Sequence, residues 1–340
     1  MNDGGRPATT RAVQYVGYGG GAAALQHGDI WGPSYVEIPL PSLKKNEVLV
    51  KVEAASINPA DWKIQKGMLR PFYPKFPCIP VTDVAGEIIE VGTAVHEFKV
   101  CDKVLCKLKF GKGGGLTQYV AAPESATVAR PAGVSAVDAA GLPISGLTAL
   151  QALLSMGTRF DGRGTGGGAS VLVTAASGGV GTYAVQLAKL GGHHVTATCG
   201  ARNVDLVRSL GADEVLDYTT PEGAALRSPS GKKYDYIINT TDAVAWSAFK
   251  PRLSNHGRVV DVTPSPRNYV AAALTVFSRK KITMLTLVSL GKEHMGFLLD
   301  LVAQGKLRTV VDSRHPFDKA REAWERSMAG HATGKIIVEM

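Results

Sequence analysis

The segment that most limits the possible folds of this chain is VLVTAASGGVGTYAVQLAKL. An apolar run, Val171–Thr174, leads into a turn that contains Gly178 and Gly181, and a helical stretch, Val180–Leu190, follows at once. A pyrophosphate reaches the backbone N–H groups of such a turn only where side chains are missing, and the helix N-terminus then attracts its negative charge. A second apolar run, Val195–Thr198, follows at the spacing of the next parallel strand. The pattern predicts a dinucleotide-binding site, with a purely structural glycine turn as the alternative.

The residues after the second run indicate which dinucleotide is bound. Sites for NAD place Asp or Glu about 20 residues beyond the glycines, where the acid holds the ribose 2′-hydroxyl. Here the sequence reads Gly200-Ala201-Arg202-Asn203, without an acid. The guanidinium of Arg202 has the right shape to pair with a 2′-phosphate, so the sequence favours NADPH. The alternative is an exposed arginine in the first turn of the next helix, and Gly200 stands where a hydroxyl side chain would have helped.

Strands and helices continue to alternate beyond this point. Further strands are predicted at Glu214–Leu216, Tyr236–Ile238 and Val259–Val262, and a helix at Asn203–Leu210. Such alternation is typical of βαβ units. We therefore expect an α/β fold with a doubly wound parallel sheet.

The first third of the chain has a different pattern. Short runs of Val and Ile, separated by Gly and Pro, favour a barrel-like β domain. Its predicted strands are Arg11–Val16, Glu47–Ile57, Val84–Val91 and Lys103–Leu108. Helical spacing appears at Val137–Met156, Glu293–Gln304 and Asp318–Met328, before a last strand at Lys335–Glu339.

Composition excludes several classes of protein. The 340 residues are 45% hydrophobic and 20% charged, which excludes a disordered chain. Four scattered cysteines are too few for a disulfide scaffold and indicate a reducing compartment. No apolar run approaches the roughly 18 residues of a transmembrane helix, and the N-terminus lacks the apolar core of a secretory signal. We expect a protein that is neither secreted nor transmembrane.

The net charge of +9 is spread along the sequence, with small concentrations at Lys99–Lys112 and Arg279–Lys281. A nucleic-acid-binding protein would gather this excess on one face, so we expect no nucleic-acid partner. A solvated basic surface explains the charge. The alternatives are attraction of a polyanionic cofactor and loose contact with an anionic membrane surface.

Several phrases, spread over nearly the whole chain, point to a known family. They are Ser56-Ile57-Asn58-Pro59-Ala60-Asp61-Trp62-Lys63, Asp83-Val84-Ala85-Gly86, Ala176-Ser177-Gly178-Gly179-Val180-Gly181, Leu210-Gly211-Ala212-Asp213 and Ala332-Thr333-Gly334-Lys335. With them the chain resembles the zinc-independent quinone oxidoreductase branch of the medium-chain dehydrogenase/reductase superfamily, and its plant members above all. The resemblance implies a GroES-like β-barrel catalytic domain over residues 1–137. It also implies a Rossmann domain over 138–288 and a return to the catalytic domain over 289–340.

We expect no metal site. Catalytic zinc needs about three Cys, His or carboxylate ligands. Zinc-dependent relatives have a Cys-His pair where this chain has Asn58-Pro59, and Gly-His-Glu where it has Val81-Thr82-Asp83. Neither replacement preserves the ligands. The adjacent His193 and His194 point to opposite faces of a predicted strand.

Without zinc, the suitable acceptors are activated ones: quinones, and C=C bonds conjugated to a carbonyl. Hydride addition to the β-carbon leaves an enolate, so the protein must orient the acceptor, exclude water and donate to the carbonyl oxygen. Lys63 is the predicted donor, with Asn58 and Asp61 as further polar groups of the site. The alternatives are that Lys63 contacts only the cofactor or solvent, and that Asn58 and Asp61 hold their loop in shape.

The resemblance also implies the remaining cofactor contacts. Ser177, Gly178, Gly179, Val180 and Gly181 would wrap the pyrophosphate, Gly200, Ala201, Arg202 and Asn203 the 2′-phosphate, and Tyr218 the adenine. Thr148, the run Leu285, Thr286 and Leu287, and the pair His331 and Ala332 would border the nicotinamide end. Tyr218 could equally close a βα loop, and the run at 285–287 could be a core strand.

Besides Gly200, two further features depart from the family pattern. Gln26–Tyr35 looks like an insertion, expected as a longer surface loop in which Trp31 and Tyr35 could cover part of the site. Cys101 stands in a turn where relatives have glycine, and a positive φ there would cost on the order of 1 kcal/mol.

The sequence thus predicts an NADPH-dependent oxidoreductase that reduces quinones or α,β-unsaturated carbonyls, oxidised-lipid enones among them. An enoyl-thioester reductase remains open, because Lys107, Lys109 and Lys112 could attract an acyl carrier. So does an NADPH-binding scaffold or peripheral membrane protein with little turnover. The resemblance allows a monomer or a homodimer, in the cytoplasm or associated with the chloroplast envelope.

Overall fold

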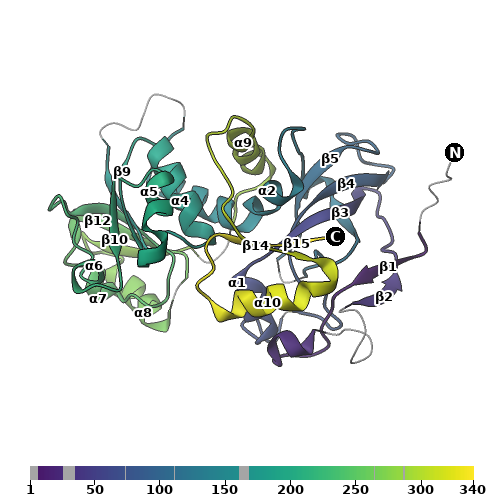
Figure 1. The fold of residues 1–340 in the computed structure, drawn as a ribbon, viewed down its shortest axis with the longest axis horizontal. Coiled ribbons are helices and arrows are strands. Elements are labelled where there is room, and N and C mark those ends of the chain that lie inside the picture. Colours follow the sequence, from purple (N-terminus) through teal and green to yellow (C-terminus); the bar gives the residue numbers. More distant parts are fainter. Residues whose placement is uncertain are drawn as a thin grey trace. The chain divides into compact units, whose positions relative to one another are not determined.

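The computed structural model describes residues 7–25, 35–72, 74–110, 112–160, 168–263, 265–285 and 288–340. The chain divides into two units, coloured by sequence in Figure 1. The first unit comprises Met1–Ile144, Gly291–Gln304 and Val311–Met340, and the second comprises Ser145–Leu290 and Gly305–Val310. The boundary between the two units therefore lies after Ile144, whereas the sequence predicted it after residue 137. The structure also assigns residues 305–310 to the second unit.

The second unit is built on a six-stranded sheet in the order β10-β9-β8-β11-β12-β13, with every pair parallel. The strands are β8 (Ser170–Val173), β9 (His194–Cys199), β10 (Glu214–Asp217), β11 (Tyr234–Asn239), β12 (Leu253–Asp261) and β13 (Lys281–Met284). The helices are α3 (Leu147–Ser155), α4 (Gly179–Leu190), α5 (Val204–Ser209), α6 (Pro221–Ala224), α7 (Trp246–Phe249) and α8 (Pro266–Thr275). The predicted doubly wound parallel sheet is confirmed. Its strand order, 3-2-1-4-5-6 within the unit, is that of dinucleotide-binding folds.

The first unit is built on a seven-stranded sheet in the order β14-β15-β3-β4-β5-β7, with β6 also paired to β3. Its strands are β3 (Glu47–Ile57), β4 (Asp83–Val91), β5 (Lys103–Lys107), β6 (Tyr119–Pro123), β7 (Thr127–Ala129), β14 (Val311–Pro316) and β15 (Lys335–Glu339). A separate pair is formed by β1 (Thr9–Ala12) and β2 (Val36–Pro39). The helices are α1 (Pro59–Gln65), α2 (Ala136–Ala140), α9 (Lys292–Ala303) and α10 (Ala320–Ala329). Apart from parallel β14–β15, the ladders of this sheet are antiparallel.

The helical stretch predicted at Val137–Met156 is divided into three pieces. A π-helical turn, Leu142–Gly146, separates α2 from α3. Its Pro143 lacks a backbone N–H, so the regular α-helical hydrogen-bond ladder cannot pass through it.

Helix α1 was not predicted as a helix, and the structure shows how it is held. It begins at Pro59, a residue whose fixed φ suits the first helical position. At its other end, Gln65 accepts from the buried Trp324 Nε1 of α10 at 3.3 Å and donates to the carbonyl of Gly21 at 2.9 Å. Both of these anchors lie in the first unit, so α1 is fixed within it.

The turn at Cys101 does require a positive φ: the value is 72°. A side chain in this region costs on the order of 1 kcal/mol because Cβ crowds the backbone, whereas glycine adopts it freely. Cys101 is exposed, so little packing offsets this cost.

Replacing Cys101 by glycine should therefore stabilise the protein by about 1 kcal/mol. The midpoint of urea unfolding measures the change. Cys101→Ser is the matched control, because it keeps the Cβ and should give no gain. A Gly variant no more stable than the Ser variant would show that the turn is not strained.

Candidate functional site

The glycine-rich turn joins β8 to α4 in the second unit. The N–H of Ala176 donates to the carbonyl of Thr198 at 2.8 Å, which ties the turn to β9. At Gly181 a Cβ would lie 2.4 Å from the carbonyl oxygen of Ala175 and 2.7 Å from the Cα of Ala176. The first turn of α4 is therefore held close against the loop, and its first N–H groups have no partner within the helix. This cradle, which contains the predicted residues Ser177–Gly181, fits a pyrophosphate.

The carboxyl edge of the sheet next to this turn is polar. The strand order reverses between β8 and β11, and ligands of open α/β sheets bind at this point. The hydroxyl of Thr174 donates to Asn239 Oδ1 at 2.8 Å and accepts from the N–H of Thr240 at 3.0 Å. No sequence motif marks Thr174, Asn239 or Thr240. The signal that could have identified them is a polar side chain at the end of each apolar strand.

The predicted 2′-phosphate and adenine contacts lie together at the ends of two paired strands, Gly200–Asn203 after β9 and Tyr218 after β10. Gly200 precedes a single 3₁₀ turn, Ala201–Asn203, in which Arg202 is exposed. A Cβ at Gly200 would lie 3.6 Å from the hydroxyl of Tyr218, whose side chain is 46% exposed. The structure thus brings Gly200, Arg202 and Tyr218 to one edge of the sheet, and Asn203 in the same turn is buried.

The residues predicted at the nicotinamide end are more scattered. Thr148 is buried on α3. Leu285 directly follows β13, and its N–H donates to the carbonyl of Asp261 at 2.8 Å. Thr286 and Leu287 lie outside the described residues.

His331 and Ala332 belong to the first unit, shortly before β15. His331 is exposed and has a φ of 56°. Ala332 packs against the hydrophobic core of that unit. Both residues therefore border the segment that leads into Lys335.

The most unusual feature of the first unit is a buried polar network around Asn58. Its side-chain NH₂ donates to Asp83 Oδ2 at 2.9 Å and to the carbonyl of Ser56 at 3.1 Å. Its side-chain oxygen accepts from the ammonium of Lys335 at 2.6 Å. Asn58 is 4% exposed, Asp83 0% and Lys335 2%. Both ends of the Asn58 amide are therefore occupied by the protein itself, which matches the alternative that Asn58 holds its loop in shape.

Asp61 also points inward. Its carboxylate accepts from the N–H of Asn58 at 2.7 Å, which caps the start of α1. Burial raises the pKa of the Asp61 carboxyl to about 7, although the N–H groups of Asn58 and Val81 and the charge of Lys335 oppose the rise. Burial likewise raises the pKa of Asp83 and lowers that of Lys335, while the attraction between the two charges works against both shifts. Two carboxyl groups and one ammonium thus share a site removed from water.

Lys63 lies in the last turn of α1 and is half-buried. Its ammonium is 5.6 Å from the centre of the Trp62 ring. Of the three predicted catalytic residues, Lys63 is thus the most accessible. Asn58 and Asp61, at the start of the same helix, are buried.

Comparisons with known proteins agree with this architecture. The family model of the alcohol dehydrogenase GroES-like domain matches residues 44–132, and that of zinc-binding dehydrogenases matches residues 210–338. A chloroplast envelope quinone oxidoreductase homolog from Arabidopsis thaliana is 56% identical over 333 residues, which cover 96% of this chain and 98% of that protein. This chain belongs to the quinone oxidoreductase branch of the medium-chain dehydrogenase/reductase superfamily. It is therefore an oxidoreductase with a nicotinamide cofactor.

Other members of the superfamily are similar over most of their length. An NADPH-dependent alkenal/one oxidoreductase of Arabidopsis thaliana chloroplasts is 33% identical over 317 residues, covering 88% of this chain and 74% of that protein. The solved structure of a quinone oxidoreductase from Coxiella burnetii is 28% identical and superposes with a TM-score of 0.83, covering 98% and 99% of the two chains.

The two segments expected to replace the ligands of zinc-dependent relatives, Asn58-Pro59 and Val81-Thr82-Asp83, meet in the first unit. Here Asn58 and Asp83 bond to each other, and the hydroxyl of Thr82 donates to Asp83 Oδ1 at 3.1 Å. Within the described ranges, no group of three or more His, Cys, Asp or Glu is arranged to hold a metal ion.

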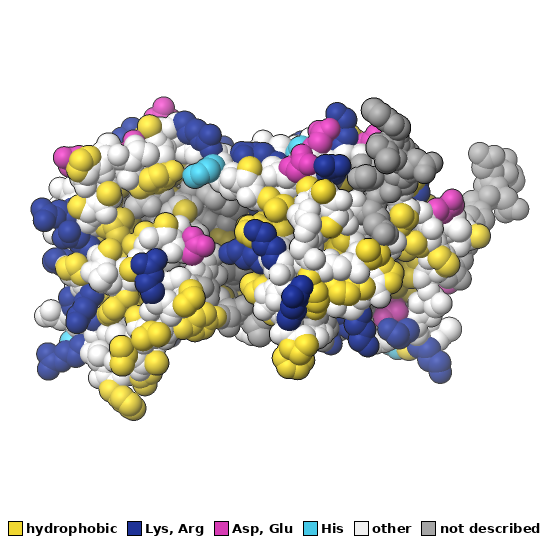
Figure 2. All heavy atoms as spheres, turned by 90° about the horizontal axis from the view of Figure 1, so that it is seen from below, with side chains coloured by type: hydrophobic (Ala, Val, Ile, Leu, Met, Phe, Trp, Pro, Cys, Tyr) yellow, Lys and Arg dark blue, Asp and Glu magenta, His cyan; other side chains and the backbone are white. Residues whose placement is uncertain are grey.

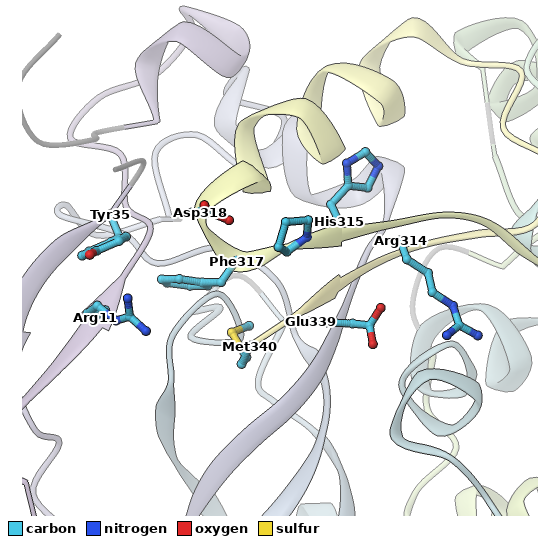
Figure 3. Close-up of a pocket in the computed structure, with 9 residues that line it drawn as sticks. Arg11, Tyr35, Arg314, His315, Phe317, Asp318, Glu339 and Met340 are labelled. Atoms are coloured by element: carbon cyan, nitrogen blue, oxygen red, sulfur yellow. The ribbon is translucent and has the colours of Figure 1, made fainter. Parts of the chain in front are cut away.

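The first unit has an open pocket of about 520 Å³. Figure 3 shows the side chains that line it. The guanidinium carbon of Arg11 lies 4.8 Å from the centre of the Tyr35 ring and 5.9 Å from that of Phe317. Tyr35 is the last residue of the predicted insertion, and residues 26–34, Trp31 among them, lie outside the described part of the chain. None of the predicted catalytic or cofactor-binding residues lines this pocket.

On the face seen in Figure 2, Lys and Arg side chains are scattered among apolar and uncharged ones. No single basic stripe is visible there. Among the described helices, none is long and apolar enough to cross a membrane.

Proposed function

We propose that this chain is an NADPH-dependent reductase that delivers hydride, without zinc, to quinones or to the C=C bond of α,β-unsaturated carbonyls. The observation that carries the proposal is the cradle at Gly181, together with an exposed arginine, in place of an acid, after β9. The names of the relatives, which include quinone and alkenal/one oxidoreductases, support the same acceptors.

Each group of residues has a separate task. NADPH supplies the hydride when bound. The turn at Ser177–Gly181 binds the pyrophosphate, Gly200–Asn203 the 2′-phosphate, and Tyr218 covers the adenine. Thr148 and Leu285 border the nicotinamide end, with His331 and Ala332 at its far edge. Lys63 donates to the acceptor's carbonyl oxygen and stabilises the negative charge that hydride addition creates there.

The direct test follows the loss of reduced-nicotinamide absorbance with purified protein. NADPH and NADH are compared against one quinone, one short enone and one long-chain oxidised-lipid enone. Turnover that favours NADPH with a quinone or an enone supports the proposal. Turnover of an enoyl thioester alone would indicate the thioester reductase, and tight NADPH binding without any turnover would indicate a scaffold.

Replacing Arg202 by glutamine should weaken NADPH binding by about 10–100-fold and leave NADH binding nearly unchanged, because only NADPH carries the 2′-phosphate that pairs with the guanidinium. Fluorescence titration of both cofactors measures the effect. Arg208→Gln, on α5 of the same unit and 63% exposed, is the matched control. Equal losses for both cofactors, or none, would contradict the assignment.

We further propose a chloroplast location with peripheral contact to an anionic membrane. The chloroplast names of relatives support the location. The feature that supports membrane contact is α8 and the residues after it, where Leu274 is 76% exposed and Phe277 fully exposed beside Arg279–Lys281. Sedimentation with anionic vesicles should carry the protein down at low salt and release it at high salt. Recovery only in the supernatant at low salt would exclude membrane contact.

A further inference from the structure

The buried ammonium of Lys335 occupies the centre of the first unit's polar network. Strand β15 runs antiparallel to β3, with Ile336 opposite Ile57, so the register continues from Lys335 to Asn58. The contact that results, 2.6 Å from Nζ to Asn58 Oδ1, joins residues 277 positions apart. A lysine this deeply buried is retained only when it is paired and hydrogen-bonded.

The network connects the starting points of three elements. Asn58 precedes α1, Asp83 begins β4, and Lys335 begins β15. Asp83 also accepts from the N–H of Ile144, within the π-helical turn, at 3.1 Å. A single cation therefore holds together segments that no local pattern connects.

Backbone strain appears at the same place. Val81 has a φ of 72° and is completely buried, and its N–H bonds to the carboxylate of Asp61. A β-branched residue keeps such a conformation only when its surroundings enforce it, and strain of this kind concentrates at functional sites. Because Asp61 also caps α1, the strained segment and the helix are held by the same group.

We propose that Lys335 is a positioning residue, whose ammonium holds Asn58 and Asp83 so that α1 presents Lys63 in the geometry that the reaction requires. The inference rests on the proposed role of Lys63. The C-terminal end of α1 is fixed separately by Gln65 and Trp324, so loss of Lys335 should loosen the helix from its N-terminal end.

The titratable groups around this network determine how its net charge changes with pH. Asp61 and Asp83 face Lys335, and Lys107 on β5 faces Asp83. Tyr15 and Cys78 face Asp61. Without the Lys335 ammonium, the two carboxylates lose a common counter-charge and repel each other, and protonation at lower pH relieves this repulsion.

The test is a double-mutant cycle in kcat with Lys335→Met, Asp83→Asn and the two combined. Each single variant should lower kcat for a short enone about 10–100-fold at pH 8, because small misplacements of a catalytic group are costly. The NADPH dissociation constant should stay within about twofold, since the cofactor cradle lies in the second unit. The double variant should regain much of the loss, because removing one carboxylate together with the ammonium restores the net charge of the wild-type site. Relative to wild type, Lys335→Met should also recover several-fold at pH 6.

Lys319→Met, at an exposed lysine of the same unit, is the matched control and should behave as wild type. Three outcomes would overturn the proposal. The losses in kcat could be additive in the double variant, the loss in Lys335→Met could be independent of pH, or both single variants could keep the kcat of wild type. Amide hydrogen exchange of α1 provides a readout without turnover: Lys335→Met should exchange at least about tenfold faster there than Lys319→Met. If the wild-type protein reduces no acceptor, the proposed function fails. Amide hydrogen exchange of α1 then decides by itself whether Lys335 holds the helix.

Discussion

Replacing Lys63 by methionine should lower kcat for quinones and enones by about 10²–10³-fold, the usual cost of removing one donor to a developing oxyanion. Methionine keeps most of the length and apolar contact of the lysine stem but cannot donate. The NADPH dissociation constant should change less than about twofold, since the lost interaction forms only in the transition state. Steady-state kinetics with a short enone, together with a fluorescence titration of NADPH, measures both quantities.

Lys66→Met is the matched control. Lys66 directly follows α1, and its ammonium lies 4.9 Å from the centre of the same Trp62 ring, but its side chain is exposed. This variant should keep wild-type kcat. If Lys63→Met instead weakens NADPH binding and retains kcat, the lysine contacts the cofactor and another group must stabilise the enolate.

Replacing Gly181 by alanine should have the second large effect. The added Cβ would lie 2.4 Å from the carbonyl oxygen of Ala175 and 2.7 Å from the Cα of Ala176, and neither is the flexible end of a side chain. The turn and α4 must therefore move apart. We expect a loss of about 1–3 kcal/mol in the stability of the second unit, as in other overpacked sites, and NADPH binding at least about tenfold weaker.

Urea unfolding and NADPH titration measure these two losses. Gly133→Ala makes the same chemical change where no atom lies within 4 Å of the new Cβ, and it should be nearly neutral. An unchanged midpoint and affinity in Gly181→Ala would show that the turn adapts, and would remove the steric argument for the cradle.

The alternating and apolar runs predicted several elements closely. Glu47–Ile57 and Lys335–Glu339 are strands with the predicted bounds, because each run of β-branched residues is long enough to define a buried strand. Val311–Pro316 was not predicted as a strand, since its sequence, VDSRHP, is polar and ends in proline. It becomes β14 only because β15 offers a parallel edge to pair with.

Some residues of the candidate site could likewise be located from the sequence, and others could not. The pyrophosphate turn could be located from sequence, since the need for glycine between a strand and a helix is a local steric requirement. The residues Thr174, Asn239 and Thr240 could not, because they meet only where the parallel strands align. Asn58 and Asp61 were named as polar groups of the site, yet sequence could not show that they face inward.

The sequence by itself determined the parallel sheet, the glycine turn and the absence of an acid after β9. Each of these depends on residues close together in the chain, where sterics and hydrogen bonding act locally. Only the tertiary structure decided that Lys335 bonds to Asn58 and attracts Asp83, and that the pKa of Asp61 rises to about 7. The register between β15 and β3 and the exclusion of water depend on segments far apart in the chain, and no local pattern encodes them.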